Sequence, residues 1–292
     1  TEQVLPDGGH FELSPMYHSI FLEDLMDLIN LSQLYPERIP KDQKKAWKKN
    51  AERMLKFLLG ICHPDGEIPL FNDAAKGIAP KPLELVKYAK RLNLNIPKPT
   101  PKIKKVSFQQ YNDSGYICFK SDFAFSMLDV ARIGPNYLPA HGHADTLSFE
   151  LSVFKKRFIV NGGTSTYQRG PIRQFERSTS AHNTIEIDNK NSSEVWSEFR
   201  VARRAYPLNL KIEDNKNEIK VYCSHNGYKQ THKRKWIFSE NKLLIEDKIL
   251  GEFNKGFARF YLHPDIKIIK KKQDTYLLEH GGKTLVIKNL AI

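Results

Sequence analysis

The hydrophobic period of the chain changes once, at a short segment that contains Pro97, Pro99 and Pro101. Before this segment apolar residues recur at helical spacing, and after it apolar and polar residues alternate as they do in β-strands. Prolines at every second position form a stiff, extended linker. The sequence therefore predicts two domains, a helical one at residues 1–100 and a β-domain at residues 101–292.

Local signals place three helices before this linker. Ser14 is a good N-cap and Pro15 suits the first helical position, so the first helix is expected to begin there. The tripeptide Pro-Asp-Gly occurs beside each of the two longer helices, which indicates a repeated helix pair, as in a toroid or solenoid of helices. The three helices are expected over residues 14–35, 41–62 and 82–92.

Strand-length runs separated by turn residues follow the linker. Their length and spacing predict an antiparallel β-sandwich, so the fold class is α+β with two domains. The runs cover residues 115–120, 123–131, 147–153, 157–160, 184–188, 218–224, 235–238 and 242–247.

Two histidines, His141 and His143, flank Gly142 just before the expected strand at residues 147–153. Apolar and polar residues alternate in that strand, so one face should be buried and the other exposed. Glycine allows a ligand to approach the backbone closely, and a neutral imidazole binds metal ions. A polar turn with two solvated histidines would give the same pattern, and the pattern alone leaves both interpretations open.

The formal net charge of +13 predicts attraction to polyanions, which include nucleic acid, an anionic membrane surface and an acidic polysaccharide. The sequence has no recognisable nucleic-acid-binding module, so we expect no nucleic acid partner. No apolar run approaches the roughly 20 residues that a membrane-spanning helix needs. The three cysteines are widely spaced and odd in number, which favours buried thiols over a disulfide framework.

Three polar residues, His143, Asn161 and His182, occur at the edges of expected strands. If these strands are neighbours, the three side chains converge as two imidazoles and an amide oxygen, a set that suits zinc when a water completes it. An amide oxygen is a weaker zinc ligand than a carboxylate. Arg173 and Arg177 are close in sequence, and their guanidinium groups suit bidentate contact with carboxylate or sulfate.

Five stretches of the chain resemble the heparinase II/III-like polysaccharide lyases. They occur in the order found in that family and lie within about two-thirds of the chain. The resemblance implies an incomplete α/α toroid, entered partway by this chain, followed by an antiparallel β-sandwich. The matching stretches are residues 6–18 (PDGGHFELSPMYH), 64–73 (PDGEIPLFND), 140–145 (AHGHAD), 161–164 (NGGT) and 177–184 (RSTSAHNT).

The chemistry implied by this resemblance is β-elimination of a uronate-containing glycan. The reaction requires neutralisation of the C5 carboxylate, a base for the C5 proton and an acid for the leaving oxygen. The resemblance gives Tyr17 the role of base or acid, His141 that of a second catalytic group, and Tyr167 that of the second tyrosine of some members. The family's upstream Asn/His pair, which neutralises the carboxylate, has no counterpart in this chain.

The resemblance also implies one divalent metal ion, with zinc the first choice, held by His143, Asn161 and His182; relatives often have aspartate at the position of Asn161. His18 follows Tyr17 at the mouth of the first helix, next to the turn that contains His10 and Glu12. We therefore expect substrate contacts from His10, Glu12, His18, Arg173 and Arg177.

The sequence thus predicts a polysaccharide lyase that acts on an acidic glycan. The alternative is a noncatalytic glycan-binding or surface-polysaccharide assembly protein with the same fold, because a fold does not fix a function. No signal peptide is recognisable, and we expect a periplasmic or secreted bacterial protein, with a cytoplasmic location as the alternative. The oligomeric state is not indicated.

Overall fold

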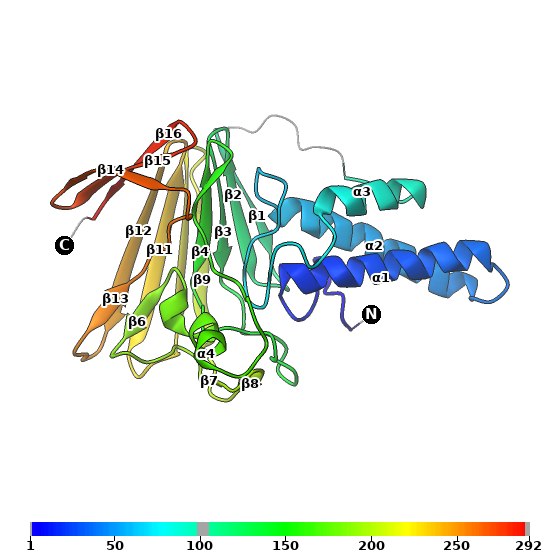
Figure 1. The fold of residues 1–292 in the computed structure, drawn as a ribbon, viewed down its shortest axis with the longest axis horizontal. Helices are drawn as coiled ribbons and strands as arrows, with labels where there is room; N and C mark the ends of the chain where they lie inside the picture. The colour runs from blue at the N-terminus through cyan, green and yellow to red at the C-terminus, as the bar shows by residue number, and fades with distance from the viewer. Residues whose placement is uncertain (1, 98–104, 290–292) are drawn as a thin grey trace.

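The computed structural model describes residues 2–97 and 105–289. Most of the expected proline linker, including Pro99 and Pro101, therefore lies outside the described residues. Three helices precede it and form one group (Figure 1), in agreement with the prediction: α1 (Pro15–Leu34), α2 (Lys41–Ile61) and α3 (Pro82–Arg91). The side chain of Ser14 accepts a hydrogen bond from the backbone N–H of Tyr17 and so caps α1.

The three helices pack through a shared apolar core. Leu22 and Met26 of α1, Leu55 and Leu58 of α2, and Leu85 of α3 are buried there. Burial of each such side chain stabilises the folded state by about 1.5–3 kcal/mol. Within residues 2–97 and 105–289, none of the helices is both long enough and apolar enough to cross a membrane.

Two antiparallel sheets follow the helices and pack face to face. Phe119 and Phe238, one from each sheet, stack with their ring centroids 4.9 Å apart, and Trp236 is fully buried beside them. The predicted order of helices followed by an antiparallel sandwich is confirmed. The first sheet contains β1 (Val106–Tyr111), β2 (Tyr116–Ser121), β3 (Ala124–Asp129), β4 (Phe149–Val153) and β5 (Lys156–Ile159); the second contains β9 (Pro207–Asp214), β10 (Glu218–His225), β11 (Thr231–Ser239) and β12 (Lys242–Leu250).

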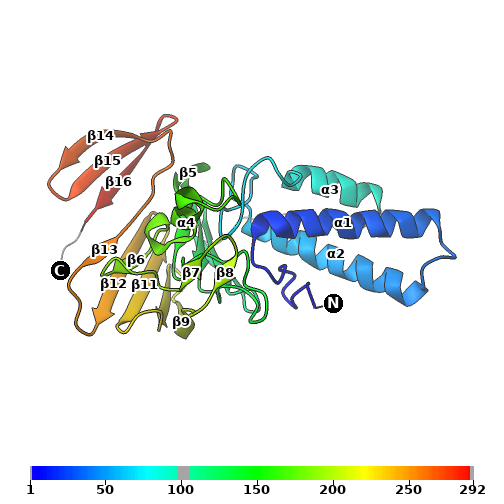
Figure 2. The same cartoon turned by 60° about the horizontal axis from the view of Figure 1, so that its bottom comes forward.

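Several smaller elements complete the β-domain, and Figure 2 shows the last sheet at the end of the molecule away from the helices. The sequence did not predict this sheet, whose strand β14 is exposed along its whole length and so lacks the alternation of a half-buried strand. The elements are α4 (Pro171–Arg177), the 3-10 helix η1 (Thr179–Ala181), and the pairs or sheets β6 (Ile185–Ile187) with β13 (Gly256–Ala258), β7 (Val195–Trp196) with β8 (Arg200–Val201), and β14 (Lys267–Lys272) with β15 (Thr275–His280) and β16 (Lys283–Lys288).

Strand β4 is buried on both faces, which corrects the expectation that one of its faces is exposed. The polar side chains of Glu150 and Ser152 face the helical part and are buried. The ring of His63 lies between them, with Nδ1 2.6 Å from the Ser152 hydroxyl and Nε2 2.9 Å from a Glu150 oxygen. The alternation of apolar and polar residues in β4 correctly predicted a strand. Its polar face can nevertheless be buried, because polar groups on the loop after α2 form hydrogen bonds with it.

Candidate active site

Three residues from separate parts of the chain meet where the N-terminus of α1 approaches the β-domain. Tyr17 lies in the first turn of α1, His141 in the connection between β3 and β4, and Tyr167 in the connection between β5 and α4. The rings of Tyr17 and His141 have centroids 4.2 Å apart, and the hydroxyls of Tyr17 and Tyr167 are 3.0 Å apart. The structure therefore brings together the three residues that sequence reasoning expected to be catalytic.

Asp73 connects this cluster to the buried side chains beneath it. One carboxylate oxygen lies 2.9 Å from Nδ1 of His141, and the other lies 2.9 Å from Nε2 of His143. Arg173 contacts both oxygens, with Nη2 2.7 Å from Oδ2. Burial alone would raise the pKa of Asp73, but these hydrogen bonds outweigh burial and hold the pKa well below its usual range. Asp73 is therefore a carboxylate anion at neutral pH.

Sequence reasoning assigned no role to Asp73, although Asp73 ends one of the stretches that resemble the lyase family. No spacing rule links Asp73 to His141, because the two residues are 68 positions apart in the sequence. Asp73 could have been found by looking for a carboxylate that orients the expected catalytic histidine. Such a partner is common because it fixes the orientation and tautomer of an imidazole.

The carboxylate of Asp73 sets which nitrogen of His141 is free. A carboxylate accepts hydrogen bonds, so Nδ1 of His141 carries the hydrogen and Nε2 keeps its lone pair. Nε2 lies 3.8 Å from a carboxylate oxygen of Glu12, and both side chains are partly exposed. An imidazole that is oriented by a buried carboxylate and open to solvent at Nε2 has the arrangement of a general base.

Tyr167 forms the outer wall of the cluster. Its side chain stacks near Phe199, with ring centroids 5.5 Å apart, and the guanidinium carbon of Arg173 lies 5.1 Å from the centre of its ring. Burial, the hydrogen bond with Tyr17 and the charge of Asp73 raise the pKa of Tyr167. Tyr167 therefore keeps its proton and can donate it in a hydrogen bond to the oxygen of Tyr17.

Two of the expected substrate contacts, His10 and His18, are buried. Nε2 of His18 lies 3.0 Å from the carbonyl oxygen of Met54, and its ring packs against Phe57. Burial lowers the pKa of His18 to about 4 and, with the nearby histidines, that of His10 to about 3. The position of His18 in the first turn of α1 did not indicate that its side chain points toward α2. Of the three expected residues in this segment, Glu12 is the one whose carboxylate approaches Nε2 of His141, at 3.8 Å.

Arg173 and Arg177, which were also expected to contact substrate, are fully buried. Arg173 pairs with Asp73 and donates to the carbonyl of Glu198. Arg177 donates to the carbonyls of Gly142 and Trp196, at 3.1 and 3.3 Å. Both guanidinium groups therefore fix the loops that carry the cluster.

The three expected metal ligands are neighbours in the structure. Nδ1 of His182 lies 3.2 Å from Oδ1 of Asn161, and the ring centroids of His143 and His182 are 5.2 Å apart. Nδ1 of His143 and Nε2 of His182 are buried without a hydrogen-bond partner among the described residues. A buried polar atom without a partner costs about 1–3 kcal/mol, which a shared cation would remove. The two imidazoles therefore fit a metal ion, whereas the Asn161 oxygen is already used.

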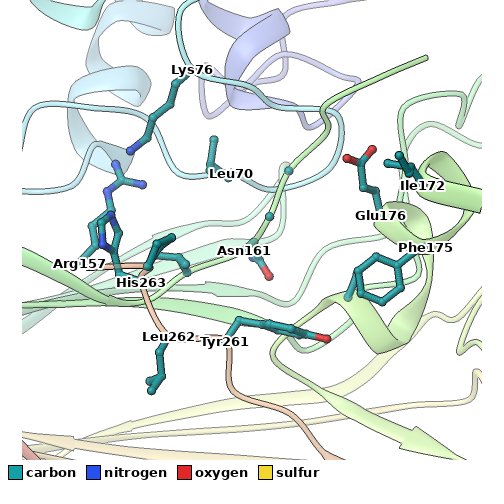
Figure 3. Close-up of a pocket in the computed structure, with 15 residues that line it drawn as sticks. Leu70, Lys76, Arg157, Asn161, Ile172, Phe175, Glu176, Tyr261, Leu262 and His263 are labelled. Atoms are coloured by element: carbon teal, nitrogen blue, oxygen red, sulfur yellow. The ribbon is translucent and has the colours of Figure 1, made fainter. Parts of the chain in front are cut away.

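Asn161 also lines a pocket of about 520 Å³. Figure 3 shows its side chain in the middle of this pocket, with Lys76 and Arg157 at one end and Glu176 at the other. His263, which also lines this pocket, belongs to a separate set of side chains in the described part of the chain whose metal-ligating atoms are closely spaced. The set is His263, Asp265 and His280. The sequence did not predict this set.

Comparisons with known proteins match nearly the whole chain. A family profile described as heparinase II/III N-terminus matches residues 1–91, and one described as heparinase II/III-like, C-terminal, matches residues 104–290. A heparin-sulfate lyase from Bacteroides stercoris is 24% identical over 93% of this chain and 41% of its own length. One from Pedobacter heparinus is 24% identical over 99% of this chain and 45% of its own length. The chain thus spans less than half the length of these relatives.

Solved structures show the same fold at low sequence identity. A heparinase III gene product has a TM-score of 0.73 and 21% identity, and the match covers 94% of this chain and 44% of that one. A heparan sulfate lyase from Pedobacter heparinus has a TM-score of 0.67 and 19% identity, and the match covers 98% of this chain and 50% of that one. The expected fold, part of an α/α toroid followed by a β-sandwich, is therefore confirmed. Because the two family profiles together match residues 1–91 and 104–290, the chain belongs to the heparinase II/III family.

Proposed function

We propose that this chain is part of a polysaccharide lyase that cleaves an acidic, uronate-containing glycan by β-elimination. The observation that carries the proposal is the contact of Tyr17 and Tyr167 with His141, whose Nδ1 is held by the buried carboxylate of Asp73. The heparin-sulfate lyases that resemble the chain support the same reaction class. The net charge of +13 favours encounter with a polyanionic substrate.

We propose a role for each residue in the elimination. Nε2 of His141 accepts the C5 proton, and Asp73 stabilises the imidazolium that forms. Tyr17 donates its hydroxyl proton to the glycosidic oxygen as the C4–O bond breaks and the C4–C5 double bond forms. The hydroxyl of Tyr167 donates a hydrogen bond to the oxygen of Tyr17 and stabilises the negative charge that develops there.

Glu12 lies at the mouth of this cluster and is the remaining substrate contact that we propose from the N-terminal segment. Burial and the charge of Asp73 raise the pKa of Glu12, and His141 opposes that effect. A carboxylate 3.8 Å from Nε2 of His141 also stabilises the protonated imidazole. We expect Glu12 to accept hydrogen bonds from sugar hydroxyls.

We also propose that His143 and His182 bind one divalent metal ion, with zinc the first choice and Asn161 beside them. A bound cation would satisfy their two partnerless ring nitrogens. It would supply a fixed positive charge under the loop that carries His141. Metal analysis of the purified protein tests this proposal: His182→Asn should lose one bound ion, and an unchanged metal content would contradict it.

The activity is tested with purified full-length protein and a panel of glycans. Heparan sulfate, heparin and other uronate polysaccharides are incubated with the protein, and the ultraviolet absorbance of the unsaturated product is followed. We expect absorbance to rise with at least one uronate glycan and to stay flat with a neutral glucan. Tight binding of the glycans without any product would instead favour a noncatalytic glycan-binding protein.

A further inference from the structure

His263, Asp265 and His280 form a second cluster outside the proposed active site. Their ligand atoms lie within 4.8 Å of one another. Oδ2 of Asp265 is 3.8 Å from Nδ1 of His263 and 3.9 Å from Nε2 of His280. His263 belongs to the connection between β13 and β14, and His280 is the last residue of β15. The cluster therefore joins two segments of the C-terminal part of the chain.

Backbone contacts hold both histidines against β5. The N–H of His263 donates to the carbonyl of Phe158 at 3.0 Å, and Nδ1 of His280 donates to the carbonyl of Arg157 at 2.8 Å. The two imidazoles stack with centroids 4.9 Å apart and an interplanar angle of 20°. The His263 and His280 side chains are mostly buried, with exposed fractions of 23% and 11%. Both rings are thus positioned before any ligand binds.

The hydrogen bonds also fix which nitrogens face the carboxylate. A carbonyl only accepts, so Nδ1 of His280 carries hydrogen and its Nε2 has the lone pair. The backbone N–H of Asp265 points to Nδ1 of His263 at 3.2 Å, so that nitrogen also presents a lone pair. Two imidazole lone pairs and a carboxylate therefore face one another, an arrangement that is repulsive until a cation lies between them.

We propose that His263, Asp265 and His280 bind a divalent transition-metal ion, with Zn²⁺ as the best match. Two imidazoles and a carboxylate suit zinc and its neighbours better than Ca²⁺ or Mg²⁺, which prefer oxygen ligands. Tetrahedral zinc with bonds of about 2.0–2.1 Å separates its ligand atoms by about 3.3 Å. The Asp265 oxygen, now 3.8 and 3.9 Å from the two ring nitrogens, would therefore move inward by roughly 0.5 Å when zinc binds. Asp265 is 74% exposed and free to make that shift, and water supplies the fourth ligand.

Surrounding groups modify the affinity of this site. The carbonyl of Arg157 orients His280, as partners of metal-bound imidazoles usually do. Lys76 lies at the same end of the pocket as His263 (Figure 3), and its charge opposes binding of a dication. The ion also takes the lone pair of His263 that the N–H of Asp265 now shares. We therefore expect a site weaker than a four-ligand structural zinc centre.

A bound ion would hold the C-terminal sheet to the rest of the β-domain. His280 ends β15, the middle strand of the sheet β14-β15-β16, and His263 is tied to β5. The ion therefore adds a link between the sandwich and a sheet that is largely exposed. Because the ion binds the folded chain, added zinc should raise the melting temperature.

The test measures Zn²⁺ binding to metal-stripped full-length protein by calorimetry, together with the melting temperature with and without Zn²⁺. Asp265→Asn and His263→Gln should each weaken binding at this site at least tenfold and abolish its share of the rise in melting temperature. Asp274→Asn is the matched control, because Asp274 is exposed in the turn between β14 and β15. It should behave as the wild type does.

The proposal does not rest on the proposed lyase function, and its outcomes are separate. His182→Asn should lose the ion near the active site while it keeps the zinc-dependent stabilisation that Asp265→Asn removes. The proposal is overturned if wild-type protein gains no zinc-dependent stability. It is also overturned if Asp265→Asn and His263→Gln bind zinc with the affinity and stoichiometry of the control.

Discussion

The Nδ1 atom of His141 lies 2.9 Å from Oδ2 of Asp73, so a residue of the β-domain is oriented by a buried carboxylate of the helical part. The same carboxylate contacts His143 and forms an ion pair with Arg173. The geometry of the Tyr17, His141 and Tyr167 cluster therefore depends on the contact between the two parts of the chain, and Asp73 is one of the residues that make this contact.

Asp73→Asn should reduce both turnover and stability. The amide can no longer hold His141 in one tautomer or balance the charge of Arg173. We expect turnover to fall by about 10²–10⁴-fold and the free energy of unfolding to fall by about 3–5 kcal/mol. Steady-state kinetics and denaturant unfolding measure the two effects.

Asp65→Asn is the control for this change. Asp65 pairs with the buried Arg157 at 2.7 Å, away from the Tyr17 cluster. Its loss should lower stability, because it leaves the buried Arg157 without this partner. The turnover of the folded protein should stay within a few-fold of the wild type, because Asp65 pairs with Arg157 and not with a residue of the Tyr17 cluster. Equal losses of turnover in the two variants would show that Asp73 acts through stability alone.

Gly142→Ala should displace the loop between His141 and His143. A methyl group at Gly142 would lie 2.1 Å from the carbonyl oxygen of Ile133, so the backbone must move. The sequence analysis proposed that glycine at position 142 allows a ligand to approach closely. The structure shows that the backbone of Ile133 approaches Gly142 instead. Gly162→Ala is the control, because its added methyl group meets nothing within 4 Å. We expect a lower melting temperature and turnover for Gly142→Ala, and equal values for both variants would contradict this account.

His18→Gln should change how stability depends on pH. Burial lowers the pKa of His18 to about 4 in the folded protein, whereas an unfolded histidine titrates near about 6.5. Between these values the unfolded chain binds more protons, so stability falls as pH falls from 6.5 to 4, by up to about 1.4 kcal/mol per pH unit. In unfolding experiments, the stability of the variant should depend less steeply on pH over this range. The variant should keep the wild-type KM, because the His18 side chain packs against Met54 and Phe57 inside the helical part.

The periodicity of the sequence predicted most of the fold. Helical spacing located α1, α2 and α3, because each buries one apolar stripe in a common core. Alternation located β2, β3, β10 and β12, whose residues pack between the two sheets or against the helices. The exposed strand β14 and the short helix α4 gave no such signal, since neither has a wholly apolar face.

The candidate site was predictable in part. Resemblance to the lyases identified Tyr17, His141 and Tyr167, which the structure brings together. The direction of each side chain and the identity of Asp73 depend on how the two domains pack, which local patterns do not contain. For the same reason the sequence predicted a substrate contact for Arg173 and not its ion pair with the buried Asp73.

The central claim is that Tyr17 takes part in the chemistry, and Tyr17→Phe tests it most directly. The change removes the hydroxyl oxygen that contacts Tyr167. It leaves the cap of α1 intact, since the cap uses the backbone N–H of Tyr17. Tyr88→Phe is the control, because the hydroxyl of Tyr88 donates to Asp27 on the surface of the helical part, at 2.6 Å. Both variants should fold and bind a uronate glycan as the wild type does.

The decisive measurement is turnover of a uronate glycan by the full-length protein, followed through the ultraviolet absorbance of the unsaturated product. We predict that Tyr17→Phe lowers turnover by at least about 100-fold, with little change in glycan affinity. Tyr88→Phe should retain wild-type turnover. Near wild-type turnover for Tyr17→Phe would contradict the account and remove Tyr17 from the mechanism.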